Sequence, residues 1–373
     1  MKHIKIFLFS LLALFFAVSL VSAIYGYKDE YTTRFDPEYW KMRYEKSQWV
    51  VSDSKNSIGD DGLYAYAGWN YITGGDPTLL NAEMPPLGKY LIGVGEVVFG
   101  NQNILPLLIG LACLVVFYLL NLKLFASKLI ACIPVFLFSF DPLFTAQLRA
   151  PYLDTTYLLF LLLTLYFTLQ KKYVLVGIFL GCFAATKFPI GSLFLFAPVL
   201  AWVYLFDKKN MKKFIASMFL WPTVFILSYI MYFIKGGNLY SFLGVQKWIL
   251  HFYSTGVKAK YGIVYPMILF GKWYTWFGGV QKVSEWTILW PISFIGSMFA
   301  IFTFAAQYVR DRKVKIVYSG RILIALWVVS YLCFLTITPV FPRYLLLLLP
   351  FMYNLTIWFL TRYVFRPYSS SSH

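Results

Sequence analysis

Long runs of apolar residues alternate with short polar segments along most of the chain. A helix that crosses a membrane needs about 20 mostly apolar residues. By this criterion the pattern predicts an all-α polytopic membrane protein with about ten transmembrane helices. Their expected ranges are Ile4–Ile24, Ile104–Leu122, Leu129–Leu148, Thr155–Leu169, Val174–Lys187, Ile190–Phe206, Phe214–Ile234, Glu285–Phe304, Ile322–Thr338 and Tyr344–Leu360.

Two segments between the predicted spans are long, residues 25–103 and residues 235–284. The first contains Leu87–Phe99, which follows Pro85-Pro86 and predicts an amphipathic helix too short to span. Such a helix is expected to lie in the membrane interface. The second segment is rich in Tyr and Trp, whose rings favour the boundary between membrane and water.

Charge predicts the orientation of these segments, because cytoplasmic loops carry an excess of Lys and Arg. With the N-terminus inside, every inside loop is basic and the two long segments lie outside, which predicts cytoplasmic termini in a plasma-membrane protein. The inside residues are Lys2, Lys5, Lys123, Lys128, Lys171, Lys172, Lys208, Lys209, Lys212, Lys213, Arg310, Arg312, Lys313, Lys315, Arg362 and Arg366. Nearly all the acidic residues fall outside.

The N-terminal residues allow a second interpretation. Residues 1–23 resemble a signal peptide, with a basic start, an apolar core and a small-residue exit at Val21-Ser22-Ala23. Cleavage would leave nine spans without changing the sidedness of the rest; an uncleaved first helix is the preferred interpretation. Residues 1–366 are expected to form a single transmembrane domain, and residues 367–373 a tail or a cloning scar.

Composition agrees with a membrane protein. The chain is 60% hydrophobic and 13% charged, whereas a soluble domain carries about 25% charge. The net charge of +17 could indicate nucleic-acid binding, but the basic residues follow the predicted topology instead. The four cysteines lie in predicted spans without metal-binding spacing. No Walker loop, GxGxxG or nucleophile elbow is present.

Candidate chemistry gathers on the outside face. Asp60 and Asp61 begin a motif in the first long segment, and three cations lie at the outer ends of spans: Arg149, Lys187 and Arg343. Such cations can anchor a helix at the interface, or together hold a phosphate or pyrophosphate. Asp60-Asp61-Gly62 taken alone also fits an ordinary turn or helix cap.

Metal binding has little support in the sequence. Glu83 and His251 are the one pair that could begin a metal site, and no paired-His spacing accompanies them. A lone histidine is more often a hydrogen-bonded interfacial residue. We therefore expect no cofactor, with a divalent metal left open.

The ordered motifs resemble those of the GT-C superfamily of membrane glycosyltransferases. The resemblance is greatest to the protein O-mannosyltransferases and the aminoarabinose (lipid A) transferases, and it covers roughly residues 55–350. The motifs that carry it are Asp60-Asp61-Gly62-Leu63-Tyr64-Ala65, Gly75-Asp76, Glu83-Met84-Pro85-Pro86-Leu87-Gly88-Lys89, Asp141-Pro142-Leu143, Arg149 with Asp154, Thr186-Lys187-Phe188 and Arg343-Tyr344 with Pro350.

This resemblance implies a GT-C-like arrangement of helices and a set of roles. Asp60 takes the place of the catalytic base, with Asp61 beside it. The donor phosphate is assigned to Arg149, Lys187, Arg343 and Tyr344, and the acceptor or sugar pocket to Glu83, Asp154 and His251. The sequence departs from the family pattern in three ways. Asp61 replaces a Glu, which is a mild change, and Met84 replaces the His or Lys that precedes Pro-Pro, so a metal or phosphate contact from that position is lost. The large soluble additions of some relatives are absent, so the acceptor is left open.

The function implied is transfer of a sugar, with inversion, from a polyprenyl-phosphate donor to an acceptor hydroxyl on the extracytoplasmic face. In a protein O-mannosyltransferase-like enzyme the donor is dolichyl phosphate mannose and the process is protein glycosylation. A transporter or flippase for an anionic lipid-linked substrate is the alternative, and a non-catalytic scaffold is a third. The sequence leaves the sugar, the carrier, the oligomeric state and the acceptor (protein, lipid or glycan) open.

Overall fold

The structure is a computed structural model of the 373-residue chain. It describes residues 17–18, 20–22, 24–255, 261–275, 278–310 and 319–364. Most of the first predicted span, the signal-peptide alternative, the basic loop after Arg310 and the tail 367–373 therefore lie outside the described residues. The described part is almost entirely helical, which confirms the predicted all-α class.

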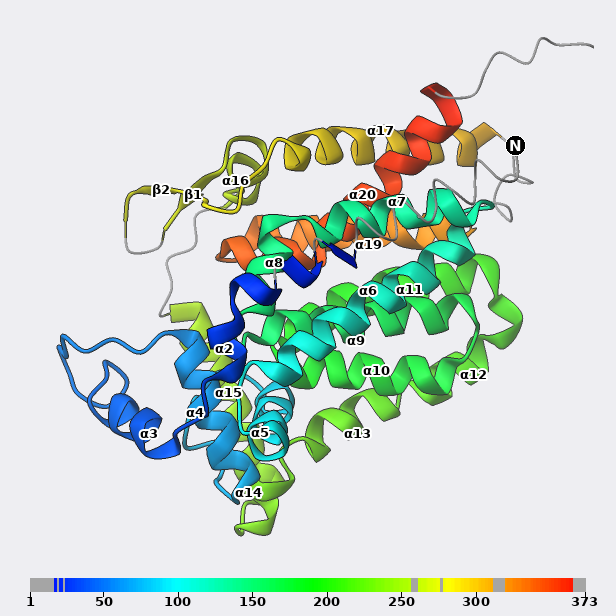
Figure 1. Cartoon of the computed structure of the whole chain (residues 1–373). Coiled ribbons are helices and arrows are strands. Elements are labelled where there is room, and N and C mark those ends of the chain that lie inside the picture. Colours follow the sequence, from blue (N-terminus) through cyan, green and yellow to red (C-terminus); the bar gives the residue numbers. More distant parts are fainter. Residues whose placement is uncertain are drawn as a thin grey trace, which may run out of the picture.

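Long apolar helices form the body of the molecule (Figure 1). In the described residues, four helices are long and apolar enough to cross a membrane, and a bent pair is a fifth candidate. Two further apolar helices, α9 and α10, have 17 and 14 residues. The predicted count of ten is not confirmed. The unbroken apolar helices are α6 (Ile104–Leu124), α9 (Leu153–Leu169), α10 (Tyr173–Thr186), α11 (Pro189–Phe206), α17 (Leu289–Arg310) and α19 (Ser319–Ile337).

The predicted span Leu129–Leu148 is bent. It consists of two helices, α7 (Lys128–Ser139) and α8 (Pro142–Leu148), and the chain bends by 68° between them. Asp141 causes the break by capping α8, because its side chain accepts a hydrogen bond from Leu143 N at 2.9 Å. The same carboxylate accepts bonds from Trp290 Nε1 at 2.8 Å and Tyr353 Oη at 2.6 Å, so neighbouring helices hold the bend in place.

The predicted span Phe214–Ile234 is also discontinuous. It consists of α12 (Met211–Ser217), α13 (Leu220–Leu227) and α14 (Ile230–Ile234). Pro222 explains the first interruption, because proline has no N–H to bond the carbonyl of Met218 and its ring clashes with that carbonyl. The last predicted span begins with a 3₁₀ turn, η2 (Pro342–Leu347), continues as α20 (Leu349–Phe359) and ends in η3 (Leu360–Val364).

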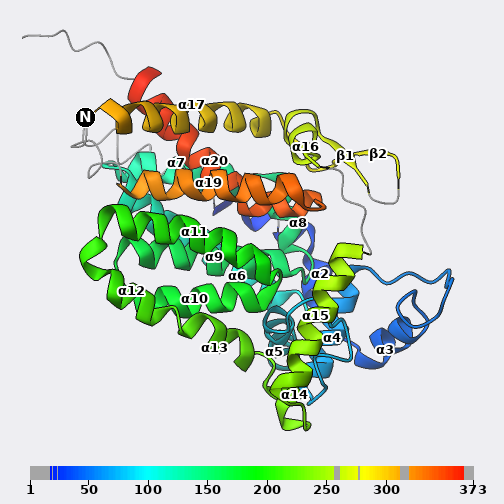
Figure 2. The same cartoon turned by 180° about the vertical axis from the view of Figure 1, so that it is seen from behind.

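The two long segments between the predicted spans, residues 25–103 and 235–284, gather at one end of the helices, and α12 lies at the other end (Figures 1 and 2). The first segment forms α2 (Lys28–Thr32), α3 (Pro37–Glu45), α4 (Asp60–Ile72) and α5 (Leu87–Phe99), so α5 has the predicted bounds. The second forms α15 (Leu239–Thr255), α16 (Val264–Phe270) and a two-stranded antiparallel hairpin of β1 (Lys272–Tyr274) and β2 (Val280–Lys282). A short turn, η1 (Lys208–Asn210), precedes α12.

A glycine pair sets the distance between α4 and α5. A Cβ added at Gly93 would lie 2.2 Å from Gly68 O, and one added at Gly68 would lie 2.6 Å from Lys89 O. Both contacts are with backbone, which cannot turn aside as a flexible side chain can. The two helices therefore cross in direct backbone contact, and this fixes α4, which carries Asp60.

We predict that Gly93→Ala lowers the free energy of unfolding by about 1–3 kcal/mol, because the new methyl group forces the two backbones apart. Gly244→Ala in α15 is the matched control, since a Cβ there meets nothing within 4 Å. Denaturant unfolding of both variants in one detergent tests this. Equal stability of the two would contradict the close α4–α5 contact.

Candidate active site

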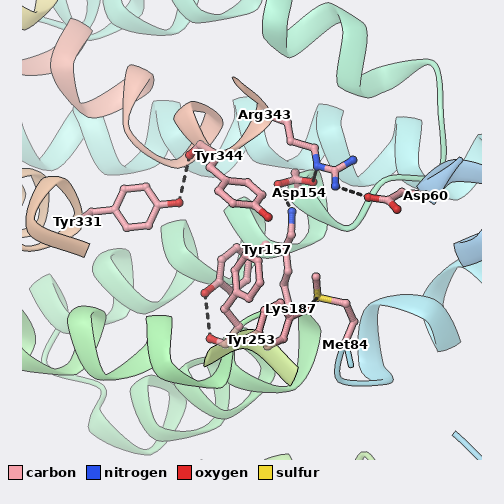
Figure 3. A network of polar contacts seen from close by, with 10 residues as sticks. Asp60, Met84, Asp154, Tyr157, Lys187, Tyr253, Tyr331, Arg343 and Tyr344 are labelled. Carbon is pink, nitrogen blue, oxygen red and sulfur yellow. Dashed lines mark hydrogen bonds and ion pairs between the residues drawn. The ribbon is translucent and has the colours of Figure 1, made fainter. Parts of the chain in front are cut away.

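Four charged side chains from distant parts of the chain form a connected cluster (Figure 3). Asp154 Oδ1 lies 2.6 Å from Lys187 Nζ, and Asp154 Oδ2 lies 3.6 Å from Arg343 Nε. Arg343 Nη2 also donates to Asp60 Oδ2. Charges thus alternate in sign from Asp60 through Arg343 and Asp154 to Lys187, and two carboxylates balance two cations.

Exposure divides this cluster into a buried and an open half. The side chains of Asp154 and Lys187 are 1% and 0% exposed, whereas that of Asp60 is 34% exposed. Arg343 links the halves, with 14% of its side chain exposed. The buried pair is shielded from water, so its interaction is stronger than that of a surface pair. Asp60 is the member that a substrate can reach.

The helix start at Gly59 explains the position of Asp60. Gly59 is the N-cap of α4, and Asp60 and Asp61 occupy its first turn. A carboxylate is favoured there because the unpaired N–H groups give a helix N-terminus a partial positive charge. The sequence allowed a helix cap at Asp60-Asp61-Gly62, whereas the structure has the cap at Gly59. Neither carboxylate therefore caps the helix, and both remain available for other contacts.

Aromatic rings enclose the two cations. The Lys187 ammonium lies 4.4 Å from the centre of the Tyr344 ring, and the Arg343 guanidinium lies 4.9 Å from that of Phe341. Such ring faces attract cations. Tyr344 is fixed in turn, because Tyr331 Oη donates to its carbonyl at 3.1 Å. The rings of Phe188 and Tyr344 also meet edge to face.

A cavity of about 520 Å³ opens beside the exposed half of the cluster. Its wall comes from the α2 region, the α8–α9 turn, the β hairpin and η2. The charged residues that line it are Glu30, Asp61, Arg149, Lys282, Glu285 and Arg343. Three cations therefore border a space large enough for a headgroup or a sugar.

The structure separates the three cations that the sequence grouped together. Arg149 and Arg343 line the cavity, and the Arg149 guanidinium also stacks 4.2 Å from the Tyr27 ring centre. Lys187 does not line it, because it is buried against Asp154 and Tyr344. In this arrangement Lys187 acts on the cavity only through Asp154 and Arg343.

A second buried cation, Lys89, holds the loop between α4 and α5. Its ammonium donates to Asn81 O at 2.7 Å, Asn81 Oδ1 at 3.0 Å and Met84 O at 2.8 Å. Burial lowers the pKa of Lys89 to about 7, against the opposing effect of Glu83. Burial likewise raises the pKa of Glu83, whose carboxylate accepts a hydrogen bond from Asn81 Nδ2.

Glu83 and His251, both predicted for the acceptor pocket, belong to different surroundings. Glu83 is buried, and its carbonyl accepts a bond from Tyr253 Oη at 3.3 Å. His251 is exposed on α15, two residues before Tyr253. In the part of the chain that the structure describes, no three His, Cys, Asp or Glu side chains are grouped to hold a metal ion.

Several residues around the site escaped the sequence analysis. Lys89 belonged to a recognised motif, but nothing in that motif showed that its ammonium is buried. Lys282 and Trp273 line the cavity from the β hairpin, which a Tyr- and Trp-rich segment does not predict. Tyr253 reaches both Glu83 O and Met84 Sδ. A signal for Lys89 did exist, because it shares a helical face with Ile92, Gly93 and Glu96.

Comparison with solved structures identifies the arrangement of the helices. The structure matches ArnT from Cupriavidus metallidurans bound to undecaprenyl phosphate, with a TM-score of 0.62 and 13% sequence identity. It matches the apo state of the same protein with a TM-score of 0.59 and 14% identity. Both matches cover 94% of this chain and 60% of ArnT. No protein-family profile matches the sequence, and a search of curated proteins gives no match.

The chain shares the fold of ArnT. The predicted all-α polytopic arrangement is therefore confirmed as a fold like that of ArnT. The chain spans about 60% of the length of ArnT, and at this level of identity the likeness concerns the fold. The site residues predicted from the motifs stay predictions.

We predict that Asp154→Asn lowers the free energy of unfolding by about 3–5 kcal/mol, because it leaves Lys187 and Arg343 buried without their shared carboxylate. Asp60→Asn is the matched comparison, and it is expected to cost about 1 kcal/mol or less because that pair is partly exposed. Denaturant unfolding in detergent measures both. A larger loss for Asp60→Asn would show that Asp154 is not the centre of the cluster.

Proposed function

We propose that the chain is an inverting glycosyltransferase that moves a sugar from a polyprenyl-phosphate donor to an acceptor hydroxyl on the extracytoplasmic face. The observation that carries this proposal is the pairing of the partly exposed Asp60 with Arg343, because Arg343 lines the 520 Å³ cavity together with Asp61. The shared fold supports it, because ArnT binds undecaprenyl phosphate. Leu143, Ala146 and Phe341 add apolar surface to the cavity wall, which suits the start of an isoprenoid tail.

The reaction needs one base and one anion-binding group. A carboxylate oxygen of Asp60 takes the proton of the acceptor hydroxyl while the hydroxyl oxygen attacks the anomeric carbon. The bond between that carbon and the phosphate oxygen breaks, and polyprenyl phosphate leaves with the electron pair. Arg343, with Arg149 and Lys282 at the same cavity, stabilises the negative charge that develops on the leaving phosphate.

Arg343 has to serve Asp60 and the phosphate in turn. Without a donor, its Nη2 is bonded to Asp60, and its Nε has no hydrogen-bond partner among the described residues. Because Nε faces Asp154 Oδ2 at 3.6 Å, a bound phosphate competes with Asp60 for the outer nitrogens of the guanidinium. We infer that donor binding releases the Asp60 carboxylate for proton transfer, while Asp154 and Lys187 keep Arg343 in place.

The remaining roles are less direct. Asp61 lines the cavity and is a candidate to orient the acceptor. Tyr344 covers Lys187 and is proposed to shape the donor pocket. Glu83 and His251 remain candidates for the acceptor side. A protein O-mannosyltransferase-like reaction with a dolichyl phosphate mannose donor is one form of this proposal.

We predict that Asp60→Asn reduces sugar transfer by about 10²–10⁴-fold, because the amide cannot accept the proton. The assay uses purified protein with a panel of polyprenyl-phosphate sugars and measures release of polyprenyl phosphate. Asp53→Asn is the matched control, since Asp53 is exposed and its φ of 57° suits asparagine.

Full activity of Asp60→Asn would show that Asp60 is not the catalytic base. If no donor in the panel is consumed by the wild type, even with cell extract supplying acceptors, the glycosyltransferase proposal fails. Flux of an anionic lipid-linked substrate across vesicles would then test the alternative of a transporter or flippase.

We predict different signatures for the two cations beside Asp154. Arg343→Gln is expected to raise the donor KM by about tenfold or more, because a charge-assisted contact with the phosphate is lost. Lys187→Met is expected to lower stability more than it raises the donor KM, because it acts through Asp154. Steady-state kinetics and unfolding of both variants separate these effects. An unchanged donor KM in both would show that neither contributes to phosphate binding.

A further inference from the structure

A second cavity, of about 710 Å³, lies on another side of the first outside segment. It is bounded by the α2–α3 connection, by α4 and by the last turns of α5. The residues that line it include Arg34, Phe35, Asp36, Trp69, Glu96 and Val97. None of these residues belongs to the Asp60 cluster or to the first cavity.

Glu96 is the unusual member of this cavity wall. The residue is 3% exposed, and both of its carboxylate oxygens are buried without a hydrogen-bond partner among the described residues. Burial raises the pKa of Glu96 to about 9. A buried carboxyl group without donors is unfavourable for folding, because neither water nor protein compensates its lost hydration. A hydrogen-bond donor in contact with the Glu96 oxygens, best a cation, would compensate this loss.

The surroundings of Glu96 also favour a cation. Glu96 lies in the last turn of α5, where the free carbonyl groups give the helix end a partial negative charge. The rings of Phe35 and Trp69 meet at a centroid distance of 5.8 Å beside it. Aromatic faces combined with a carboxylate are suited to an ammonium group. Asp36, the other acid of the wall, is occupied as the N-cap of α3, and no three His, Cys, Asp or Glu side chains are grouped to hold a metal ion in the described part of the chain.

The rest of the cavity indicates what carries the ammonium group. Arg34 is exposed at the cavity wall and can bind a phosphate. The adjoining surface of α5 exposes apolar side chains: Val94, Val97, Val98 and Phe99 are between 37% and 64% exposed. A short helix with such a face lies in the membrane interface, where lipid headgroups are found.

We propose that this cavity binds the headgroup of an ammonium-bearing phospholipid. The ammonium group donates to Glu96 and faces Phe35 and Trp69, the phosphate contacts Arg34, and the acyl chains lie along the valines of α5. This site is separate from the donor and acceptor sites of the proposed reaction. A test of this lipid site therefore does not depend on whether the transferase proposal is correct.

Native mass spectrometry of the purified full chain in detergent tests the proposal. The probes are phosphatidylethanolamine, its N-acetylated form and phosphatidylglycerol, all with the same acyl chains. We expect the wild type to retain phosphatidylethanolamine at least about tenfold better than the other two lipids, because only this lipid offers a charged donor to Glu96. Equal retention of the three lipids by the wild type would overturn the proposal.

Variants assign the preference to this cavity. Glu96→Gln preserves shape but removes the carboxylate, and it is expected to bind the three lipids equally. Glu45→Gln, at an exposed position on α3, is the matched control and is expected to keep the preference. Arg34→Gln is expected to weaken phosphatidylethanolamine and phosphatidylglycerol alike.

Persistence of the preference in Glu96→Gln would overturn the assignment to this cavity. If Glu96→Gln fails to fold, Trp69→Leu replaces it, and an unchanged preference in that variant counts against the site in the same way. A normal sugar-transfer rate in a Glu96→Gln protein that has lost the lipid preference would confirm that the two sites are distinct.

Discussion

The pairing of Asp154 with two cations constrains the rest of the site. A carboxylate that is 1% exposed is tolerable only with a partner, and Lys187 and Arg343 supply two positive charges against its single negative one. A second carboxylate balances the remaining positive charge at the open side of the cluster, where water screens the pair and weakens it. Asp60 provides this carboxylate from the first turn of α4. These ion pairs connect α4 to α9, to the α10–α11 turn and to η2. They also hold Asp60, the partly exposed carboxylate, against Arg343, which lines the cavity with Arg149 and Lys282.

The geometry of the segment that holds α4 and α5 depends on a second cation, Lys89. Three acceptors from Asn81 and Met84 surround its ammonium group, so the loop that precedes Pro85-Pro86 is folded back onto α5. Tyr253 of α15 contacts the same loop through Glu83 O and Met84 Sδ. Because Gly68 and Gly93 bring α4 against α5, the position of Asp60 depends on this loop as well. Met84 therefore has a packing role, because Tyr253 contacts its sulfur.

The sequence predicted what depends on composition and missed what depends on distant partners. Six predicted spans coincide with α6, α9, α10, α11, α17 and α19 to within a few residues, because long apolar runs are a local signal. The bend at Asp141 was missed, since its partners Trp290 and Tyr353 are far away in the chain. The shared sidedness of Arg149, Lys187 and Arg343 was visible in the charge pattern. That Lys187 is buried beneath Tyr344, while Arg149 stacks on Tyr27, follows only from tertiary packing.

Lys89 and Glu96 show how differently one helix treats two buried ionisable groups. They lie seven residues apart, two turns along the same face of α5, and both are almost fully buried. The protein gives Lys89 three hydrogen-bond acceptors, whereas both oxygens of Glu96 lack a partner among the described residues. A leucine at position 96 would remove this cost without disturbing the helix, since leucine is a strong helix former. A fold that satisfies one charge fully has the means to satisfy the other, so the incomplete environment of Glu96 is best explained by a partner that comes from outside the chain.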